Sequence, residues 1–166
     1  MKLIVRNKFL SPTGKSTIKT EQGEHKFLVK GSFMNPKKTK KLLNTNKEVL
    51  YVIKNKFWNW MRHTAYIYNA DGELLGSVTK HKYLHSRTFE SEGFDSNFKI
   101  ERKLFSFTSE IFKDDKVVGT ITRVYKLLFN CIDTYILDTE DEENLPFYLA
   151  LVLAVDNIGD EAKKDK

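Results

Sequence analysis

Few residues in this sequence have the spacing that catalysis or metal binding requires. The segment TGKST at 13–17 resembles a phosphate-binding loop, but such a loop needs a glycine five residues before its Gly-Lys-Ser, and Phe9 occupies that position. His81 and His85 have the helical spacing of metal ligands, yet their surroundings predict a strand that runs into a turn. We therefore expect a hairpin turn at TGKST and no metal site at the two histidines.

Two further features have residue types that occur in active sites. Cys131 is the single cysteine, and no motif supplies a base and an orienting group for it, so we interpret it as a buried or incidental thiol. The acidic run DTEDEEN at 138–144 lacks the spacing of a calcium-binding EF-hand loop, and we interpret it as a solvated linker. The sequence thus predicts a non-enzymatic protein without a cofactor or metal. An enzyme with an unrecognised site is the alternative.

Lysine supplies the strongest candidate for binding. The chain has a net charge of +6, but residues 1–137 contain 25 Lys and Arg against 13 Asp and Glu, whereas residues 138–166 contain 3 against 9. A gathered band of lysines would bind phosphate groups of lipid or nucleic acid, and salt would weaken that binding. The alternative is that exposed lysines only prevent strands from associating edge to edge. The candidate binding residues are Lys37, Lys38, Lys40, Lys41, Lys54, Lys56, Lys80 and Lys82.

A short recurring pattern predicts the elements that position these lysines. VRNKF, VKGSF, IKNKF, TKHKY, IERKL and VYKL end at Phe9, Phe33, Phe57, Tyr83, Leu104 and Leu127, at spacings of 24, 24, 26, 21 and 23 residues. A unit of this length holds two strands and two turns, so six units predict about twelve strands. Closure into an antiparallel barrel would remove the unpaired edges of such an array. Trp58 and Trp60, in one of these units, either add interfacial contact or cap the barrel end.

The apolar segment NLPFYLALVLAVDNIG at 144–159 predicts a helix over about 145–158. Asn144 suits the N-cap, Pro146 the first turn and Gly159 the C-terminal stop. Its apolar residues cover every side, which indicates burial all round, and a barrel of twelve strands is too wide for wall side chains alone to fill. Fourteen helical residues span about 21 Å, too short to cross a membrane. We therefore expect a central helix, one domain over 1–159, and a flexible charged tail over 160–166.

The start Lys-Leu-Ile-Val, the K-F motifs, the turn in YNADGELLGSVT and the late DTYILDTEDEE followed by LALVLAVDNI resemble the LURP-one-related family, which includes YxjI-type bacterial proteins. That family is similar to the tubby C-terminal domain and the phospholipid scramblases. The resemblance implies a twelve-stranded barrel around a central hydrophobic C-terminal helix. Tubby proteins bind phosphoinositides and scramblases act at membranes, but no residue here aligns with the phosphoinositide-binding positions, and no scramblase-type calcium-binding segment or membrane anchor is visible.

These observations predict a cytoplasmic barrel protein that is peripheral at the membrane. The N-terminal segment MKLIVRNKFL reaches a charge too early to supply the apolar core of a secretory signal. The expected partners are anionic lipid headgroups or a protein, and no transmembrane segment is expected. The alternative function is a nucleic-acid-binding or regulatory protein-interaction module.

Overall fold

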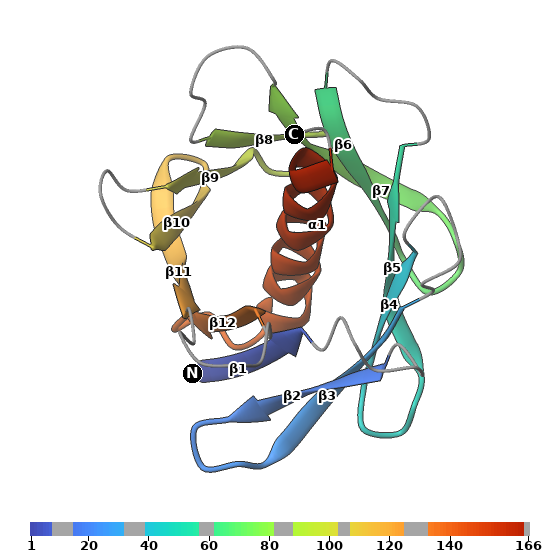
Figure 1. The fold of residues 1–166 in the computed structure, drawn as a ribbon, viewed down its shortest axis with the longest axis vertical. Helices are drawn as coiled ribbons and strands as arrows, with labels where there is room; N and C mark the ends of the chain where they lie inside the picture. The colour runs from blue at the N-terminus through green and yellow to red at the C-terminus, as the bar shows by residue number, and fades with distance from the viewer. Residues whose placement is uncertain are drawn as a thin grey trace.

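Twelve antiparallel strands form a closed barrel around one helix (Figure 1). The computed structural model describes residues 1–7, 15–31, 39–56, 62–81, 88–102, 107–124 and 133–164. Each strand pairs with its neighbours in the chain, and β1 pairs with β12 to close the ring, as the repeat predicted. The strands are β1 (Lys2–Asn7), β2 (Lys15–Thr20), β3 (His25–Gly31), β4 (Lys40–Leu43), β5 (Val49–Asn55), β6 (Arg62–Tyr68), β7 (Leu74–His81), β8 (Thr88–Glu92), β9 (Phe98–Arg102), β10 (Thr108–Lys113), β11 (Lys116–Val124) and β12 (Asp133–Asp138).

The hydrophobic core lies between the inner faces of the strands and the helix α1 (Leu145–Lys164). Successive side chains of a strand point to opposite faces, so every second residue of the barrel wall points inward. Ile53, Ala65 and Ile67 are inward residues of this kind, and all three are fully buried. On α1 every residue from 148 to 154 is buried. The helix is therefore enclosed on all sides, as its apolar composition predicted.

The two ends of the barrel differ in how they join the strands. At one end, which we call the turn end, residues 21–24, 44–48, 69–73, 93–97 and 114–115 connect consecutive strands, and residues 139–144 lead from β12 into α1. Tight reversals there place Gly23, Gly72 and Gly93 at φ near +89°, where a residue without a side chain is least strained. At the other end, the connection end, residues 8–14, 32–39, 56–61, 82–87, 103–107 and 125–132 join the strands.

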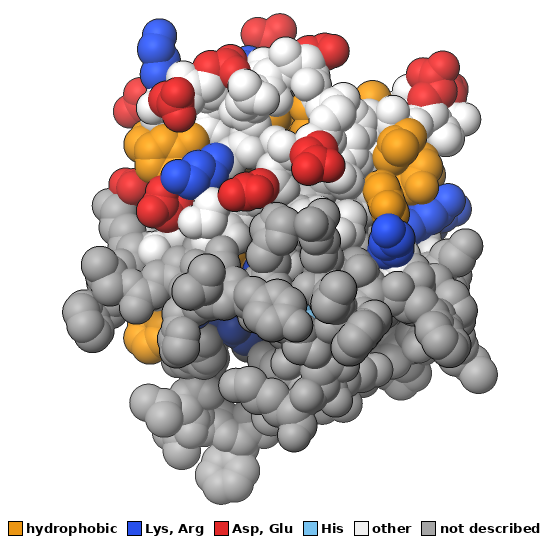
Figure 2. Space-filling model, turned by 90° about the horizontal axis from the view of Figure 1, so that it is seen from above, with side chains coloured by type: hydrophobic (Ala, Val, Ile, Leu, Met, Phe, Trp, Pro, Cys, Tyr) orange, Lys and Arg blue, Asp and Glu red, His pale blue; other side chains and the backbone are white. Residues whose placement is uncertain are grey.

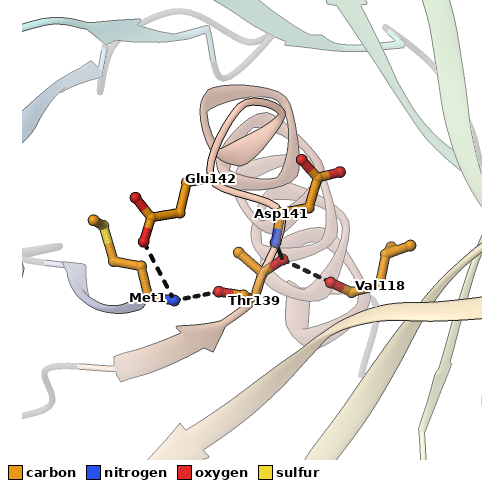
Figure 3. A network of polar contacts seen from close by, with 5 residues as sticks. All are labelled: Met1, Val118, Thr139, Asp141 and Glu142. Carbon is orange, nitrogen blue, oxygen red and sulfur yellow. Dashed lines mark hydrogen bonds and ion pairs between the residues drawn. The ribbon is translucent and has the colours of Figure 1, made fainter.

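Hydrogen bonds of Thr139 hold the segment between β12 and α1 against the barrel (Figure 3). Its hydroxyl donates to the carbonyl oxygen of Val118 at 2.6 Å and accepts from the backbone N–H of Asp141 at 3.1 Å. The amino group of Met1 donates to the carbonyl oxygen of Thr139 and lies 4.0 Å from a carboxylate oxygen of Glu142. These contacts join the strands β1 and β11 to the segment that precedes the helix.

α1 begins at Leu145, as predicted, and Asn144 is its N-cap through its backbone. The carbonyl oxygen of Asn144 accepts from the N–H groups of Phe147 and Tyr148 at 3.0 and 3.1 Å. Its side chain instead donates to the carboxylate of Asp141, to which the buried Tyr148 hydroxyl also donates at 2.7 Å. The bonds from Tyr148 and Asn144 lower the pKa of Asp141, and burial together with the Asp141 carboxylate raises the pKa of Tyr148.

The helix continues past Gly159 to Lys164, so the prediction that Gly159 ends it is wrong. A glycine inside a helix costs about 1 kcal/mol relative to alanine, and the glutamate, alanine and lysines that follow are good helix formers. One unfavourable residue therefore does not stop propagation. The flexible character of residues 160–166 stays a prediction. Within the described residues, no helix has both the length and the apolar character that a membrane crossing requires.

Candidate functional site

A buried ionic contact links α1 to the barrel wall near the connection end. Asp156 of α1, with a side chain only 2% exposed, accepts from the Lys40 ammonium, which is 11% exposed. Its other carboxylate oxygen accepts from the Tyr135 hydroxyl at 2.8 Å. Burying either charge alone would be costly, and each compensates the other here. Lys40, one of the predicted binding residues, is therefore engaged inside the barrel.

Further polar side chains lie in the barrel interior at this end. Asn55 is buried, and its amide nitrogen donates to the carbonyl oxygen of Asn157 at 3.3 Å. The Oδ1 atom of Asn55 has no hydrogen-bond partner among the described residues. His63 is also buried, and the Arg123 guanidinium lies 5.7 Å from the ring centroid of Tyr135. The interior thus changes from aliphatic in the middle of the barrel to polar at the connection end.

Three of the predicted binding lysines lie close together on β4 and at the end of β5. Lys41 and Lys56 are exposed. Lys54 is half-buried, and its ammonium lies 4.6 Å from the ring centroid of Tyr68. Successive side chains of a strand point to opposite faces. Leu42, next to Lys41, and Ile53 and Asn55, on either side of Lys54, are buried, so Lys41 and Lys54 point outward. Their side chains share the outer face of the barrel.

Lys80 differs from these three lysines. It has the parity of the buried Val78 on β7, so it lies on the inner side of the sheet, and its ammonium lies 5.6 Å from the ring centroid of Phe89. The other predicted residues fall on parts of the chain that are not described. These are Lys37, Lys38, Lys82, Trp58, Trp60, His85, Cys131 and the first two residues of TGKST, while the side chain of His81 is likewise not described.

Charge is strongly biased at the strand positions nearest the connection end. We call the last two residues of each strand at that end the basic rim. Its residues include ten Lys or Arg and two acidic residues, Glu101 and Asp133. One of the ten, Lys40, is neutralised by Asp156. The basic residues of the rim are Arg6, Lys15, Lys30, Lys40, Lys41, Lys54, Arg62, Lys80, Arg102 and Arg123.

The segments at the turn end have the opposite charge. Among them, twelve residues are acidic and Lys47 is the one basic residue. The last two strand positions at this end add six lysines and two acidic residues, so the turn end as a whole stays negative. Figure 2 shows Asp and Glu side chains spread over the described part of one face, among Lys and Arg side chains. The acidic residues of the turn segments are Glu21, Glu24, Glu48, Asp71, Glu73, Asp95, Asp114, Asp115, Glu140, Asp141, Glu142 and Glu143.

The sequences that join the strands at the connection end reinforce the contrast. They contain eight Lys or Arg and no Asp or Glu: Lys8, Lys37, Lys38, Lys56, Lys82, Arg87, Lys103 and Lys126. The rim residues missed as candidates in the sequence include Lys15, Lys30, Arg62, Arg102 and Arg123. For Lys30 and Arg102, which lie within copies of the repeat, the signal is the repeat itself, since one copy per hairpin places every copy at the same end of a barrel.

The model of the LURP-one-related family matches residues 1–156. The chain belongs to the LURP-one-related family. Its structure is similar to the X-ray structure of a protein from Arabidopsis thaliana, with a TM-score of 0.52 and 12% sequence identity over 93% of this chain and 91% of that chain. At this identity the likeness shows the fold alone, a closed barrel around a central helix. The comparison with curated proteins finds no match.

In this LURP-one-related barrel, the described residues hold no group of three or more His, Cys, Asp and Glu side chains placed to bind a metal ion. Carboxylates of the acidic run that have partners instead form hydrogen bonds or ion pairs within the protein. Asp141 accepts from Asn144 and Tyr148 at the start of α1, while Glu142 and Glu143 are exposed. The chemistry that the described site offers is therefore cationic: ammonium and guanidinium groups around one end of a barrel.

Proposed function

We propose that this LURP-one-related protein is a non-enzymatic binding protein whose basic rim attaches it to membrane surfaces that contain anionic phospholipid. The observation that carries the proposal is the separation of charge between the connection end and the turn end. A cluster of ammonium and guanidinium groups binds lipid phosphates as point charges and in bidentate contacts. The cytoplasmic leaflet, where anionic lipids collect, is the surface that this charge fits.

The expected strength follows from the lysines that reach solvent. Each Lys or Arg near an anionic membrane surface contributes about 1 kcal/mol, and the contribution decays within a Debye length. Lys41, Lys54 and Lys56 would together contribute about 3 kcal/mol. Lys40 is left out of this sum because Asp156 already neutralises its charge. Binding by these three lysines alone would therefore be weak, reversible and steeply dependent on salt, and the exposed Lys15 and Lys30 of the rim add to it.

Co-sedimentation with vesicles tests the proposal. Vesicles of phosphatidylcholine with phosphatidylserine, and of phosphatidylcholine alone, are compared at about 50 and about 300 mM salt. We expect binding to the anionic vesicles alone, lost at the higher salt. The variant K41E/K56E reverses two exposed charges of the connection end, and K26E/K116E reverses two exposed charges of the turn end, so their net charges are identical.

K41E/K56E should weaken vesicle binding at least tenfold, because two attractive charges become repulsive at about 1 kcal/mol each. K26E/K116E should change it less than threefold. Equal weakening by the two variants would mean that net charge alone governs binding, and it would contradict a site at the rim. A mobility-shift assay with an oligonucleotide completes the design. Tight nucleic-acid binding that K41E/K56E abolishes, with no vesicle binding, would favour the nucleic-acid-binding function instead.

A further inference from the structure

We infer that the barrel docks end-on, with the connection end against an anionic bilayer and the turn end directed away from it. This inference rests on the proposed function and goes further, because it specifies the orientation of the bound protein. The basic rim supplies the attractive face, and the acidic turn segments supply a repulsive face at the opposite end of the same strands.

The length of the barrel decides whether the acidic end cancels the attraction. β11, the longest strand, has nine residues. At about 3.3 Å per residue and a tilt of about 40°, its ends are roughly 20 Å apart along the barrel axis. The Debye length at physiological salt is about 8 Å. In an end-on orientation the acidic turns are therefore screened from the bilayer, whereas in a side-on orientation both ends approach it equally.

Exposed apolar side chains favour the same orientation. Among the described residues, the large apolar side chains that are most exposed are Leu74, Phe107 and Val117, at 55%, 57% and 52%. Leu74 follows Glu73, and Val117 lies close to Asp114 and Asp115, so the carboxylates beside them oppose contact with an anionic surface.

Phe107 differs because it directly precedes β10 at the connection end. An aromatic ring beside a basic rim matches the interfacial region of a bilayer, where aromatic and cationic side chains both collect. Of the three exposed apolar side chains, it is the one that end-on docking would bring to the membrane.

The chain contains its own reporter for this end. Both of its tryptophans, Trp58 and Trp60, belong to the sequence that joins β5 to β6, directly after Lys56. Because the strand ends on both sides of this sequence lie at the connection end, we expect intrinsic tryptophan emission to report on that end. A second reporter is made by W58F/W60F/L74W, which moves the tryptophan to the turn end at a side chain that is 55% exposed.

The experiment measures tryptophan emission of both proteins during titration with phosphatidylserine vesicles, with and without brominated acyl chains. Circular dichroism first confirms that W58F/W60F/L74W folds, and V117W in the same W58F/W60F background replaces it otherwise. We expect the natural protein to show a blue shift and at least twofold quenching by brominated lipid. The turn-end reporter should show neither, although it sediments with the vesicles to the same extent.

The outcomes separate the orientation from the binding itself. Co-sedimentation with quenching at the turn-end reporter, or with none at the natural tryptophans, would overturn end-on docking and leave the proposed function standing. Failure to co-sediment at low salt would overturn both. Quenching of the natural tryptophans that persists with vesicles of phosphatidylcholine alone would show that charge does not orient the barrel, and it would also overturn the inference.

Discussion

The buried contact between Lys40 and Asp156 allows a sharp test of how the helix is held in the barrel. We consider the variants K40M and D156N, alone and together. D156N removes the negative charge but keeps an oxygen that can accept from the Tyr135 hydroxyl, which lies 2.8 Å from Asp156. It leaves the Lys40 ammonium, 11% exposed, without its carboxylate. K40M leaves the carboxylate, 2% exposed, without its ammonium.

Removing one partner of a buried ion pair costs about 3–5 kcal/mol, because the remaining charge stays in a medium of low polarity. A chain of this size loses about 2–4 °C of melting temperature per kcal/mol, so each single variant should melt roughly 10 °C lower. The double variant K40M/D156N has no buried charge left. It should be destabilised less than either single variant, with a favourable coupling of at least about 2 kcal/mol.

Urea unfolding followed by circular dichroism gives the four free energies of unfolding. The exposed pair of Lys2 and Glu21, 3.7 Å apart with side chains 47% and 55% exposed, supplies the matched control. In the K2M/E21Q cycle the coupling should lie below about 1 kcal/mol. If the Lys40 and Asp156 substitutions prove additive, or if each costs less than the control, the two charges do not stabilise each other and our account of the interior is wrong.

Three further predictions concern the turn end and the strands that lead to it. In G76A the added carbon would lie 2.6 Å from a backbone carbonyl oxygen of the neighbouring strand, so we expect a loss of about 1–3 kcal/mol in urea unfolding, whereas S77A should cost little. T139V removes the hydroxyl that bonds to the Val118 carbonyl and to a backbone N–H, and it should cost about 1–3 kcal/mol in the same assay, while T139S retains most of the stability. Hydrogen bonds from Tyr148 and Asn144 lower the pKa of Asp141, so the folded state keeps this carboxyl ionised at a lower pH than the unfolded state does. The stabilisation by the ionised Asp141 carboxylate is therefore complete above about pH 4 and disappears as the pH falls through its lowered pKa. The melting temperatures of the natural protein and D141N should differ at pH 7 and converge in acid. A difference that grows in acid would contradict the direction of this pKa shift.

The fold could be predicted from the sequence because its determinants are local or periodic. Six copies of one pattern gave the number of strands, and an all-round apolar segment gave the buried helix. The end of the helix could not be found in the same way. Gly159 is a common stop signal, but its cost of about 1 kcal/mol is outweighed when the residues after it favour a helix.

The interior polar contacts lay beyond sequence reasoning for a different reason. Lys40 and Asp156 are 116 residues apart, and no periodicity marks either as a partner of the other. Lys40 also belongs to a basic run, which predicted an exposed binding residue. The difference in charge between the two ends was easier to predict from the sequence. A Lys directly before an aromatic or leucine residue follows five of the six odd-numbered strands, and the similar spacing of the hairpins requires these exits to share one end.

The two ends of the barrel differ in the contacts that their described residues make. The turn end holds the reversals with positive φ, the Thr139 contacts and the start of the helix. Exposed lysines of the connection end such as Lys41 and Lys56 take no part in those contacts, and reversing them changes the charge of one end with little cost to the core. Surface substitutions of this kind usually shift stability by less than about 0.5 kcal/mol. Loss of vesicle binding in K41E/K56E with an unchanged melting temperature would therefore report on the surface charge, because both side chains are exposed and the substitutions leave the core intact.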